Sequence, residues 1–177
     1  MLGLVAARSV QVPDDLVRSI LAPYRPTCRY LLRATIDFVR DHEDAAGGAI
    51  VGRGDFSIPE SFYIDDTGHF NAVEFNICFN QLGYVFLGYC VQHGLIHAMR
   101  EMAFEQYMAQ QLPGVLIAEL RSAFKRPMNA RDFRGAISIA TVDESRNYWA
   151  LRMPCEFADA KRGKSEGEGK VAVLKPR

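Results

Sequence analysis

One histidine and several side-chain amides surround the start of a long apolar segment, and these residue types can transfer protons and bind polar groups. His69 precedes the segment, and the amides are Asn71, Asn76, Asn80 and Gln81. An amide removed from water without a hydrogen-bond partner costs roughly 1–3 kcal/mol, so a buried helix normally avoids such side chains. An imidazole exchanges a proton near neutral pH, and a neutral amide donates and accepts without ionising. The pattern therefore indicates a site rather than an ordinary hydrophobic core.

The start of the apolar segment has the residue spacing of a helix N-terminus. Asn71 and Glu74 stand three positions apart, which predicts a capping box between their side chains and backbone amides. A capped N-terminus still carries free backbone amides, so the same end is a candidate site for a carbonyl oxygen. His69 is either a group that takes and returns a proton or a structural residue of the turn. The residues alone leave both interpretations open.

Two more amides follow within the same segment. Asn76 and Asn80 share one stripe of the expected helix, and Gly83 continues the stripe without a side chain. The stripe either lines a cavity for a polar linkage, or bonds to neighbouring backbone and to a second subunit. Asn80 and Gln81 are the candidates for orienting a water or amine nucleophile, because neutral amides both donate and accept.

Two tyrosines and two cations complete the set of candidate residues. Tyr24 lies between two prolines, and Tyr63 lies in the segment before the turn. Each is either a packing residue or a phenol that donates to an oxyanion. Lys125 and Arg126 stand at the end of an expected strand. They are either solvated or positioned to bind a carboxylate or a phosphate.

Apolar residues recur with helical spacing over about 71–93, which predicts a helix that is apolar on nearly every side. The other expected elements are a helix over 12–21, strands over 29–40 and 49–58 joined by a turn over 41–48, a helix over 99–112, strands over 115–124, 135–142, 148–155 and 169–174, and a mobile loop over 159–168. A central helix without a solvated face must be enclosed. The order therefore predicts an α+β hotdog fold, in which an antiparallel sheet wraps the helix, as one domain over residues 1–177.

Composition excludes several classes of protein. Lys plus Arg number 21 and Asp plus Glu number 21, so no overall field favours nucleic acid. The apolar run at residues 1–8 is too short for a signal peptide or a membrane span. Four widely spaced cysteines without a CxxC pair predict reduced, buried thiols in a cytoplasmic protein, without a metal ion or another cofactor.

The turn formed by Gly68, His69 and Phe70 resembles the GHF turn of β-hydroxyacyl-[acyl carrier protein] dehydratases, which are hotdog enzymes. In that family a histidine lies in the turn and a glutamate lies further along the central helix. This sequence departs from that pattern, because Asn80 and Gln81 stand where the family would have its acid. Dehydration of a β-hydroxyl would lack its proton donor here.

A second resemblance covers nearly the whole chain. The sequence resembles the FcoT-like hotdog family in six blocks that fall in the same order: residues 21–24 (LAPY), 28–31 (CRYL), 60–64 (ESFYI), 67–74 (TGHFNAVE), 78–82 (CFNQL) and 127–129 (PMN). The family includes fatty acyl thioesterases and (2E)-enoyl-[acyl carrier protein] glycyltransferases of isonitrile lipopeptide biosynthesis. Its proposed site positions correspond to Tyr24, Tyr63, Asn71 and Asn80, and all four are present.

The resemblance implies an enzyme of the carbon–nitrogen lyase class that adds glycine to the β-carbon of an enoyl thioester. His69 is then the expected base, and Lys125 or Arg126 is expected to hold the glycine carboxylate. The alternative reaction is hydrolysis of a thioester of coenzyme A or of an acyl carrier protein, with Asn80 and Gln81 orienting water. A non-enzymatic module that binds acyl chains is a third reading. Because hotdog domains build sites where two sheets meet, we also expect a homo-oligomer.

Overall fold

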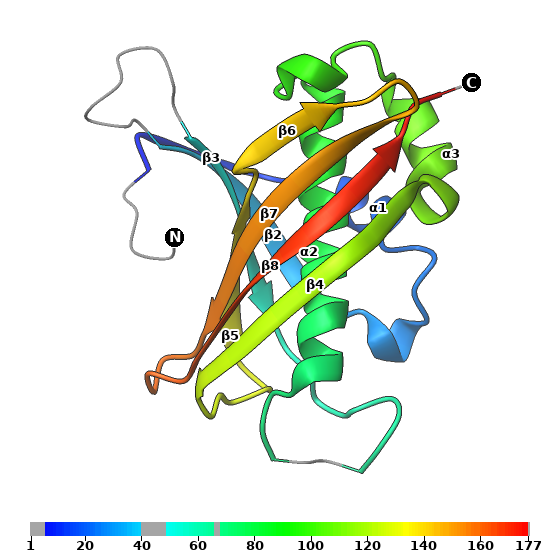
Figure 1. Ribbon diagram of the computed structural model, residues 1–177. Coiled ribbons are helices and arrows are strands. Elements are labelled where there is room, and N and C mark those ends of the chain that lie inside the picture. Colours follow the sequence, from blue (N-terminus) through cyan, green and yellow to red (C-terminus); the bar gives the residue numbers. More distant parts are fainter. Residues whose placement is uncertain (1–5, 40–48, 66–67, 177) are drawn as a thin grey trace.

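One long helix, α2 (Ala72–Gln92), lies along one face of an antiparallel sheet (Figure 1). The computed structural model describes residues 6–39, 49–65 and 68–176. The side chain of Asn71 caps the start of the helix, and His93, the C-cap, follows its last residue and precedes Gly94. Gly94 has a φ of 62°, a left-handed conformation that glycine adopts without steric cost. The expected turn over 41–48 and most of the N-terminal apolar run lie outside the described residues.

The described strands form one sheet in which all neighbouring pairs are antiparallel. Their order is β1-β2-β3-β5-β7-β8-β4, and β6 pairs with β7 beside this path. The strands are β1 (Arg8–Gln11), β2 (Leu31–Val39), β3 (Ala49–Phe56), β4 (Val115–Arg126), β5 (Phe133–Ser138), β6 (Thr141–Glu144), β7 (Tyr148–Ala158) and β8 (Lys164–Leu174). The strand β4, which follows the helices in the chain, therefore returns to one edge of the sheet.

Aromatic side chains of α2 pack against glycines of β8. A Cβ at Gly167 would lie 2.6 Å from Cζ of Phe75, and a Cβ at Gly169 would collide with the ring of Phe79. Phe75 also meets Phe157 edge to face, with ring centroids 5.1 Å apart. Because Gly167 and Gly169 of β8 have no side chains, the helix approaches the sheet closely enough to bury these rings.

Shorter helices cover part of α2 away from the sheet. Tyr107 donates from its hydroxyl to the carbonyl of Tyr84 at 2.7 Å, and Gln111 donates to the carbonyl of Ile20 at 2.8 Å. These bonds join α3 (Phe104–Gly114) to α2 and to α1 (Asp14–Ile20). The structure also has two 3-10 turns, Pro26–Cys28 and His97–Met99.

The architecture confirms the prediction of an antiparallel sheet with one central helix, and four details differ. The strand β8 begins at Lys164, so the expected loop over 159–168 is wrong in its second half. The strand expected over 135–142 is interrupted, because β5 and β6 pair with different parts of β7. The strand β1 was not expected, and α3 begins later than residue 99.

Two findings concern the class of protein. All four cysteines are free and buried, as predicted. Among the described residues, no helix has both the length and the apolar character needed to cross a membrane.

Candidate functional site

The N-terminus of α2 carries the capping box that the sequence predicted. Oδ1 of Asn71 accepts from the backbone N–H of Val73 at 2.9 Å and of Glu74 at 3.3 Å. In return, Oε2 of Glu74 accepts from the N–H of Asn71 at 3.1 Å. Glu74 is 1% exposed, and its other oxygen accepts from the hydroxyl of Ser61 at 2.6 Å. This buried carboxylate therefore ties the segment before the turn to the helix end.

Tyr63 joins the same cap from outside. Its hydroxyl donates to Oδ1 of Asn71 at 2.8 Å. Because Oδ1 accepts two backbone N–H groups as well, the orientation of the Asn71 amide is fixed, and Nδ2 points elsewhere. Within the described residues, Nδ2 donates no hydrogen bond to another protein group. The backbone N–H groups of Asn71, Val73 and Glu74 are occupied in the capping box, so these three are not the free amides that the sequence predicted, and Nδ2 of Asn71 is a further candidate donor.

His69 lies in an exposed turn directly before the cap. Gly68 has a φ of 75°, which a side chain would strain, so the turn depends on glycine at this position. The N–H of Phe70 donates to the carbonyl of Met128 at 3.2 Å. That bond places the histidine turn beside the loop that follows β4, and Arg126 is the last residue of β4.

One stripe of α2 stays partly open to solvent, contrary to the expectation of a helix without a solvated face. We call this set the open stripe, and it consists of Val73, Asn76, Ile77, Asn80 and Tyr84. Nδ2 of Asn80 donates to Oδ1 of Asn76 at 2.7 Å. The two amides are therefore bonded to one another rather than to backbone, and each retains further donor and acceptor capacity.

An apolar cleft begins at the open stripe. Asn80, Gly83 and Tyr84 line it on the helix side, and side chains of β4, β7 and β8 line it on the sheet side. Tyr24 packs against Tyr84 with ring centroids 6.5 Å apart. Burial raises the pKa of Tyr24 above its ordinary value, and the neighbouring Tyr84 and Cys78 act in the same direction. Tyr24 is therefore a neutral phenol that can donate a hydrogen bond.

Gln81 is not part of this stripe. It is fully buried, and its Oε1 accepts from the N–H groups of Tyr30 at 2.9 Å and Leu31 at 3.0 Å. Its Nε2 donates to the carbonyl of Cys28 at 2.5 Å. These three bonds explain the buried amide as a brace between α2 and the start of β2. We therefore correct the prediction that Gln81 contacts substrate.

The two cations predicted to bind a carboxylate have different surroundings. Nζ of Lys125 lies 2.9 Å from Glu166. Glu166 neighbours Gly167, which faces α2, so Glu166 and its partner belong to the opposite face of the sheet. We therefore leave Lys125 out of a site on α2. Arg126 is exposed beside the histidine turn and stays a candidate.

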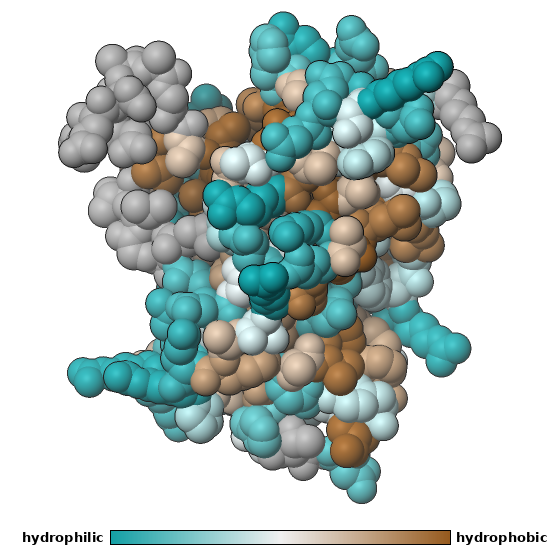
Figure 2. Space-filling view, in the orientation of Figure 1, coloured by the Kyte–Doolittle hydropathy of each residue, from teal (hydrophilic) through white to brown (hydrophobic). Residues whose placement is uncertain are grey.

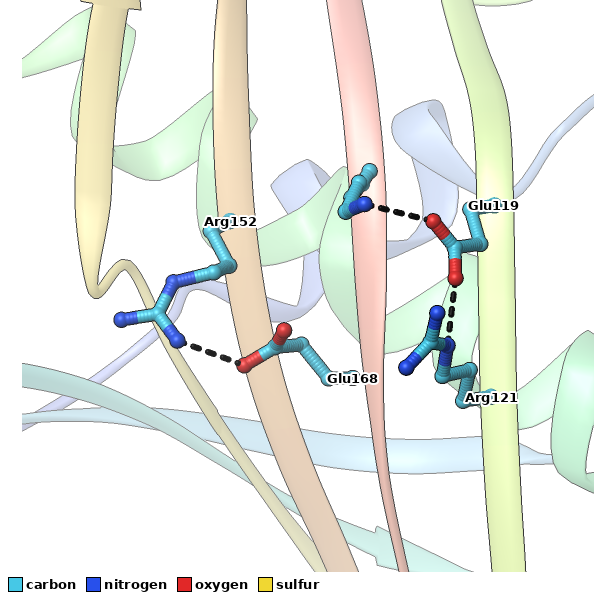
Figure 3. Close-up of polar contacts among 5 residues, drawn as sticks. Glu119, Arg121, Arg152 and Glu168 are labelled. Carbon is cyan, nitrogen blue, oxygen red and sulfur yellow. Dashed lines mark hydrogen bonds and ion pairs between the residues drawn. The ribbon is translucent and has the colours of Figure 1, made fainter.

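The outer face of the sheet carries other ion pairs. Figure 3 shows Arg152 directed at Glu168, at 3.2 Å, and Glu119 joined to Arg121. Glu119 also lies 2.6 Å from Nζ of Lys170. The space-filling view accordingly shows hydrophilic residues of this face interspersed with apolar ones (Figure 2). These outer charges are neutralised in pairs, so they do not mark an extended basic surface.

A family model of the FcoT-like thioesterase domain matches residues 19–173. The chain belongs to this family. A (2E)-enoyl-[ACP] glycyltransferase of Streptomyces coeruleorubidus is 34% identical over 175 residues, which cover 91% of this chain and 96% of the relative. A (2E)-enoyl-[ACP] glycyltransferase of Mycobacterium marinum is 36% identical over 173 residues, which cover 96% and 90%.

A solved structure supports the fold of this FcoT-like chain. A candidate thioesterase from Syntrophus aciditrophicus aligns with a TM-score of 0.50 and 12% identity, covering 90% of this chain and 94% of that one. At this identity the likeness concerns the architecture alone. It confirms the predicted hotdog fold.

Sequence reasoning missed two residues of the site in this FcoT-like chain. Ser61 bonds to Glu74 across a turn, and no local pattern signals such a contact. Tyr84 lines the cleft and contacts Tyr24. Its position one helical turn after Asn80 was a usable signal. In the described part of the chain, no three His, Cys, Asp or Glu side chains are grouped so as to hold a metal ion.

Proposed function

We propose that this FcoT-like protein adds the amine of glycine to the β-carbon of a (2E)-enoyl thioester borne by an acyl carrier protein. Relatives named for this activity match nearly the whole chain. The structural observation that carries the proposal is a bonded pair of neutral amides, Asn76 and Asn80, which leads into an apolar cleft. Such a pair bonds to an uncharged thioester without placing a charge beside its apolar chain.

The reaction is a conjugate addition in which all atoms are conserved. The glycine nitrogen forms a bond to the β-carbon, and the electron pair of the double bond moves toward the carbonyl to give an enolate. The amine then loses a proton and the α-carbon gains one, which gives a 3-(carboxymethylamino)acyl thioester. The protein must stabilise the enolate oxygen, hold glycine and move protons.

The separation of the amides along the chain distinguishes the proposed roles. Asn71, the N-cap of α2, and Asn80 are nine positions apart, or roughly 13 Å along the helix axis, so they cannot contact the same substrate atom. We assign Nδ2 of Asn71 to the carbonyl oxygen, because its Oδ1 is already occupied. The bonded pair of Asn76 and Asn80 would then orient the glycine amine at the β-carbon. Arg126 would hold the glycine carboxylate.

His69 is the proposed base. It lies in the turn that joins the cap of α2 to the loop after β4. In this role it removes the proton from the glycine ammonium group and returns one to the α-carbon. His69→Ala should lower the rate of glycine addition by about 10²-fold or more while the protein still binds the enoyl carrier protein. Full activity of His69→Ala would refute this role.

Intact mass spectrometry of a (2E)-enoyl carrier protein tests the reaction, with incubations in the presence and in the absence of glycine. The proposal predicts a gain of one glycine on the acyl group that remains bound to the carrier. Loss of the acyl group regardless of glycine would instead identify a thioesterase. Stable binding without any change in mass would identify an acyl-binding module.

We also propose that the chain forms a homo-oligomer through β4. In the described residues, β4 pairs with β8 on one side and has no strand on the other, and such an edge is a template for pairing. Leu116 and Phe124 are large exposed apolar residues of this strand. Sedimentation equilibrium should give a mass of at least a dimer, and a monomer would refute the arrangement.

The cellular setting is part of the same proposal. Four free, buried thiols are typical of a reducing compartment, which supports the cytoplasm. A role in isonitrile lipopeptide biosynthesis is supported by the family resemblance alone. Coenzyme A is the alternative thioester carrier, and replacing the carrier protein with the coenzyme A thioester in the same assay distinguishes the two.

A further inference from the structure

One arginine holds the loop that carries Tyr24. This loop, residues 21–25, joins α1 to the 3-10 turn Pro26–Cys28. Nε of Arg29 donates to the carbonyl of Tyr24 at 2.9 Å, and Nη2 of Arg29 donates to the carbonyl of Ala22 at 3.0 Å. Because both donors belong to one planar guanidinium group, the two bonds fix the orientation of the loop as well as its distance. A lysine has a single flexible ammonium group and cannot replace this pair of bonds.

Arg29 is itself fixed, because its neighbours in the chain are bonded to the central helix. Gln81 of α2 donates to the carbonyl of Cys28 at 2.5 Å and accepts from the N–H of Tyr30 at 2.9 Å. Gln81 is fully buried, so this connection is protected from water. The loop that carries Tyr24 is therefore joined to α2 through Arg29 by a short chain of hydrogen bonds.

The ring of Tyr24 returns to the same helix. It packs against Tyr84, with ring centroids 6.5 Å apart. Tyr84 lines the apolar cleft and belongs to the open stripe, one helical turn after Asn80. Tyr24 thus stands beside the open stripe as a neutral phenol. Its exact place there depends on where the backbone of its loop lies.

The bonds of Arg29 contribute to position more than to stability. The side chain is exposed, so water competes for the same groups. The turn is already closed without it, since the N–H of Tyr24 donates to the carbonyl of Leu21 at 3.0 Å. A displacement of about 1 Å can nevertheless lower an enzymatic rate by about 10²-fold. The loss of Arg29 should therefore affect the reaction more than the fold.

We propose that Arg29 is a positioning residue, which holds Tyr24 where its phenol donates to a thioester bound along the open stripe. The proposal rests on the proposed function, because it takes the addition of glycine as the reaction. Arg29 does not contact the substrate and acts only through Tyr24. Its substitution should consequently have little effect once the phenol is absent.

A double-mutant cycle tests this dependence. Arg29→Ala should lower kcat/KM for glycine addition by about tenfold or more. In a Tyr24→Phe background, the same substitution should lower kcat/KM by less than about twofold. Equal losses in the two backgrounds would overturn the proposal. Arg29→Lys keeps the charge without the planar group and should lose most of the same activity, so wild-type activity in this variant would also overturn it.

Arg25→Ala is the matched control. Arg25 is an exposed arginine of the same loop, and its side chain does not cap the 3-10 turn that follows. Arg25→Ala should keep wild-type kcat/KM, and a loss equal to that of Arg29→Ala would overturn the specific role of Arg29. Arg29→Ala should melt within about 3 °C of wild type, because its bonds are exposed. A much larger drop would show that these bonds mainly stabilise the fold, which would also contradict the proposal.

Fluorine NMR tests the position of Tyr24 without reference to the reaction. In protein labelled with 3-fluorotyrosine, the resonance of Tyr24 is the one absent from Tyr24→Phe. Arg29→Ala should shift or broaden this resonance, whereas Arg25→Ala should leave it unchanged. An unchanged Tyr24 resonance in Arg29→Ala would overturn the proposal. A shifted resonance in Arg29→Ala, together with no glycine addition by wild type, would refute the proposed reaction and leave the link between Arg29 and Tyr24 intact.

Discussion

The hydroxyl of Tyr63 donates to Oδ1 of Asn71, the same oxygen that caps α2, at a distance of 2.8 Å. One oxygen thus serves the helix and the loop before it, and the amide nitrogen is left for another partner. The contact also fixes the phenol, because its only proton is directed at Asn71. We therefore propose that the cap of the central helix is part of the site as well as a source of helix stability.

Tyr63→Phe tests the contribution of the phenol. The lost hydrogen bond should lower kcat/KM for glycine addition by about tenfold, since a bond of this kind contributes roughly 0.5–1.5 kcal/mol. Tyr63 is 40% exposed, so the melting temperature should barely change. Wild-type kcat/KM in this variant would show that the contact has no part in catalysis.

Substitution of Arg126 tests the proposed glycine site, and substitution of its neighbour Lys125 is the matched control. Arg126→Ala should raise KM for glycine by about tenfold or more, because hydrogen bonds to a charged group contribute roughly 1.5–3 kcal/mol. Lys125→Ala should leave it unchanged, since Lys125 is paired with Glu166 on the other face of the sheet. Equal effects of the two substitutions on KM would contradict the assignment.

Gln81 should matter for stability. Gln81→Leu leaves two buried N–H groups and one buried carbonyl without partners, at a cost of roughly 1–3 kcal/mol for each group. Urea unfolding should therefore show a loss of at least about 3 kcal/mol. Asn76→Ala is the control, because its exposed position predicts a change within about 0.5 kcal/mol. Equal stability of Gln81→Leu and wild type would exclude the bracing role.

Stability should fall at alkaline pH. Burial raises the pKa of Cys90 and of Cys155 from 9.0 to about 12, and nearby Glu156 and Glu168 reinforce the shift at Cys155. Above pH 9 the unfolded chain releases these protons while the folded chain keeps them, so stability decreases as pH rises toward the folded-state value. Each thiol should contribute up to about 1.4 kcal/mol per pH unit.

Urea unfolding of wild type and Cys90→Ala over a range of pH values measures that effect. The substitution lowers stability at neutral pH through lost packing, but its alkaline slope should be shallower by one thiol. Parallel slopes for the two proteins would show that Cys90 does not contribute.

Local patterns predicted the central helix and its cap, because both depend on residues a few positions apart. The spacing of Asn71 and Glu74 is sufficient to indicate a capping box, and the structure confirms it. The long apolar stretch that follows likewise indicates a helix packed on most sides. These features required no knowledge of the rest of the chain.

The features that the sequence did not predict depend on contacts between residues that lie far apart in the chain. The partners of Gln81 lie about fifty positions away, so its role as a brace has no local signal. The glycines and charges that begin β8 were mistaken for a loop, although Gly167 is small because Phe75 packs against it. Lys125 was wrongly assigned to the site, because strand pairing decides which face of the sheet a side chain occupies and the sequence does not show that pairing.

The most direct test of the account is the activity of Asn71→Asp. Aspartate caps a helix as well as asparagine does, so the melting temperature should stay close to that of wild type. It cannot donate from a side-chain nitrogen, so kcat for glycine addition should fall by about 10²–10³-fold, as when one donor to a developing oxyanion is lost. A stable Asn71→Asp variant with wild-type kcat would show that Asn71 only caps the helix, and would contradict the proposed site.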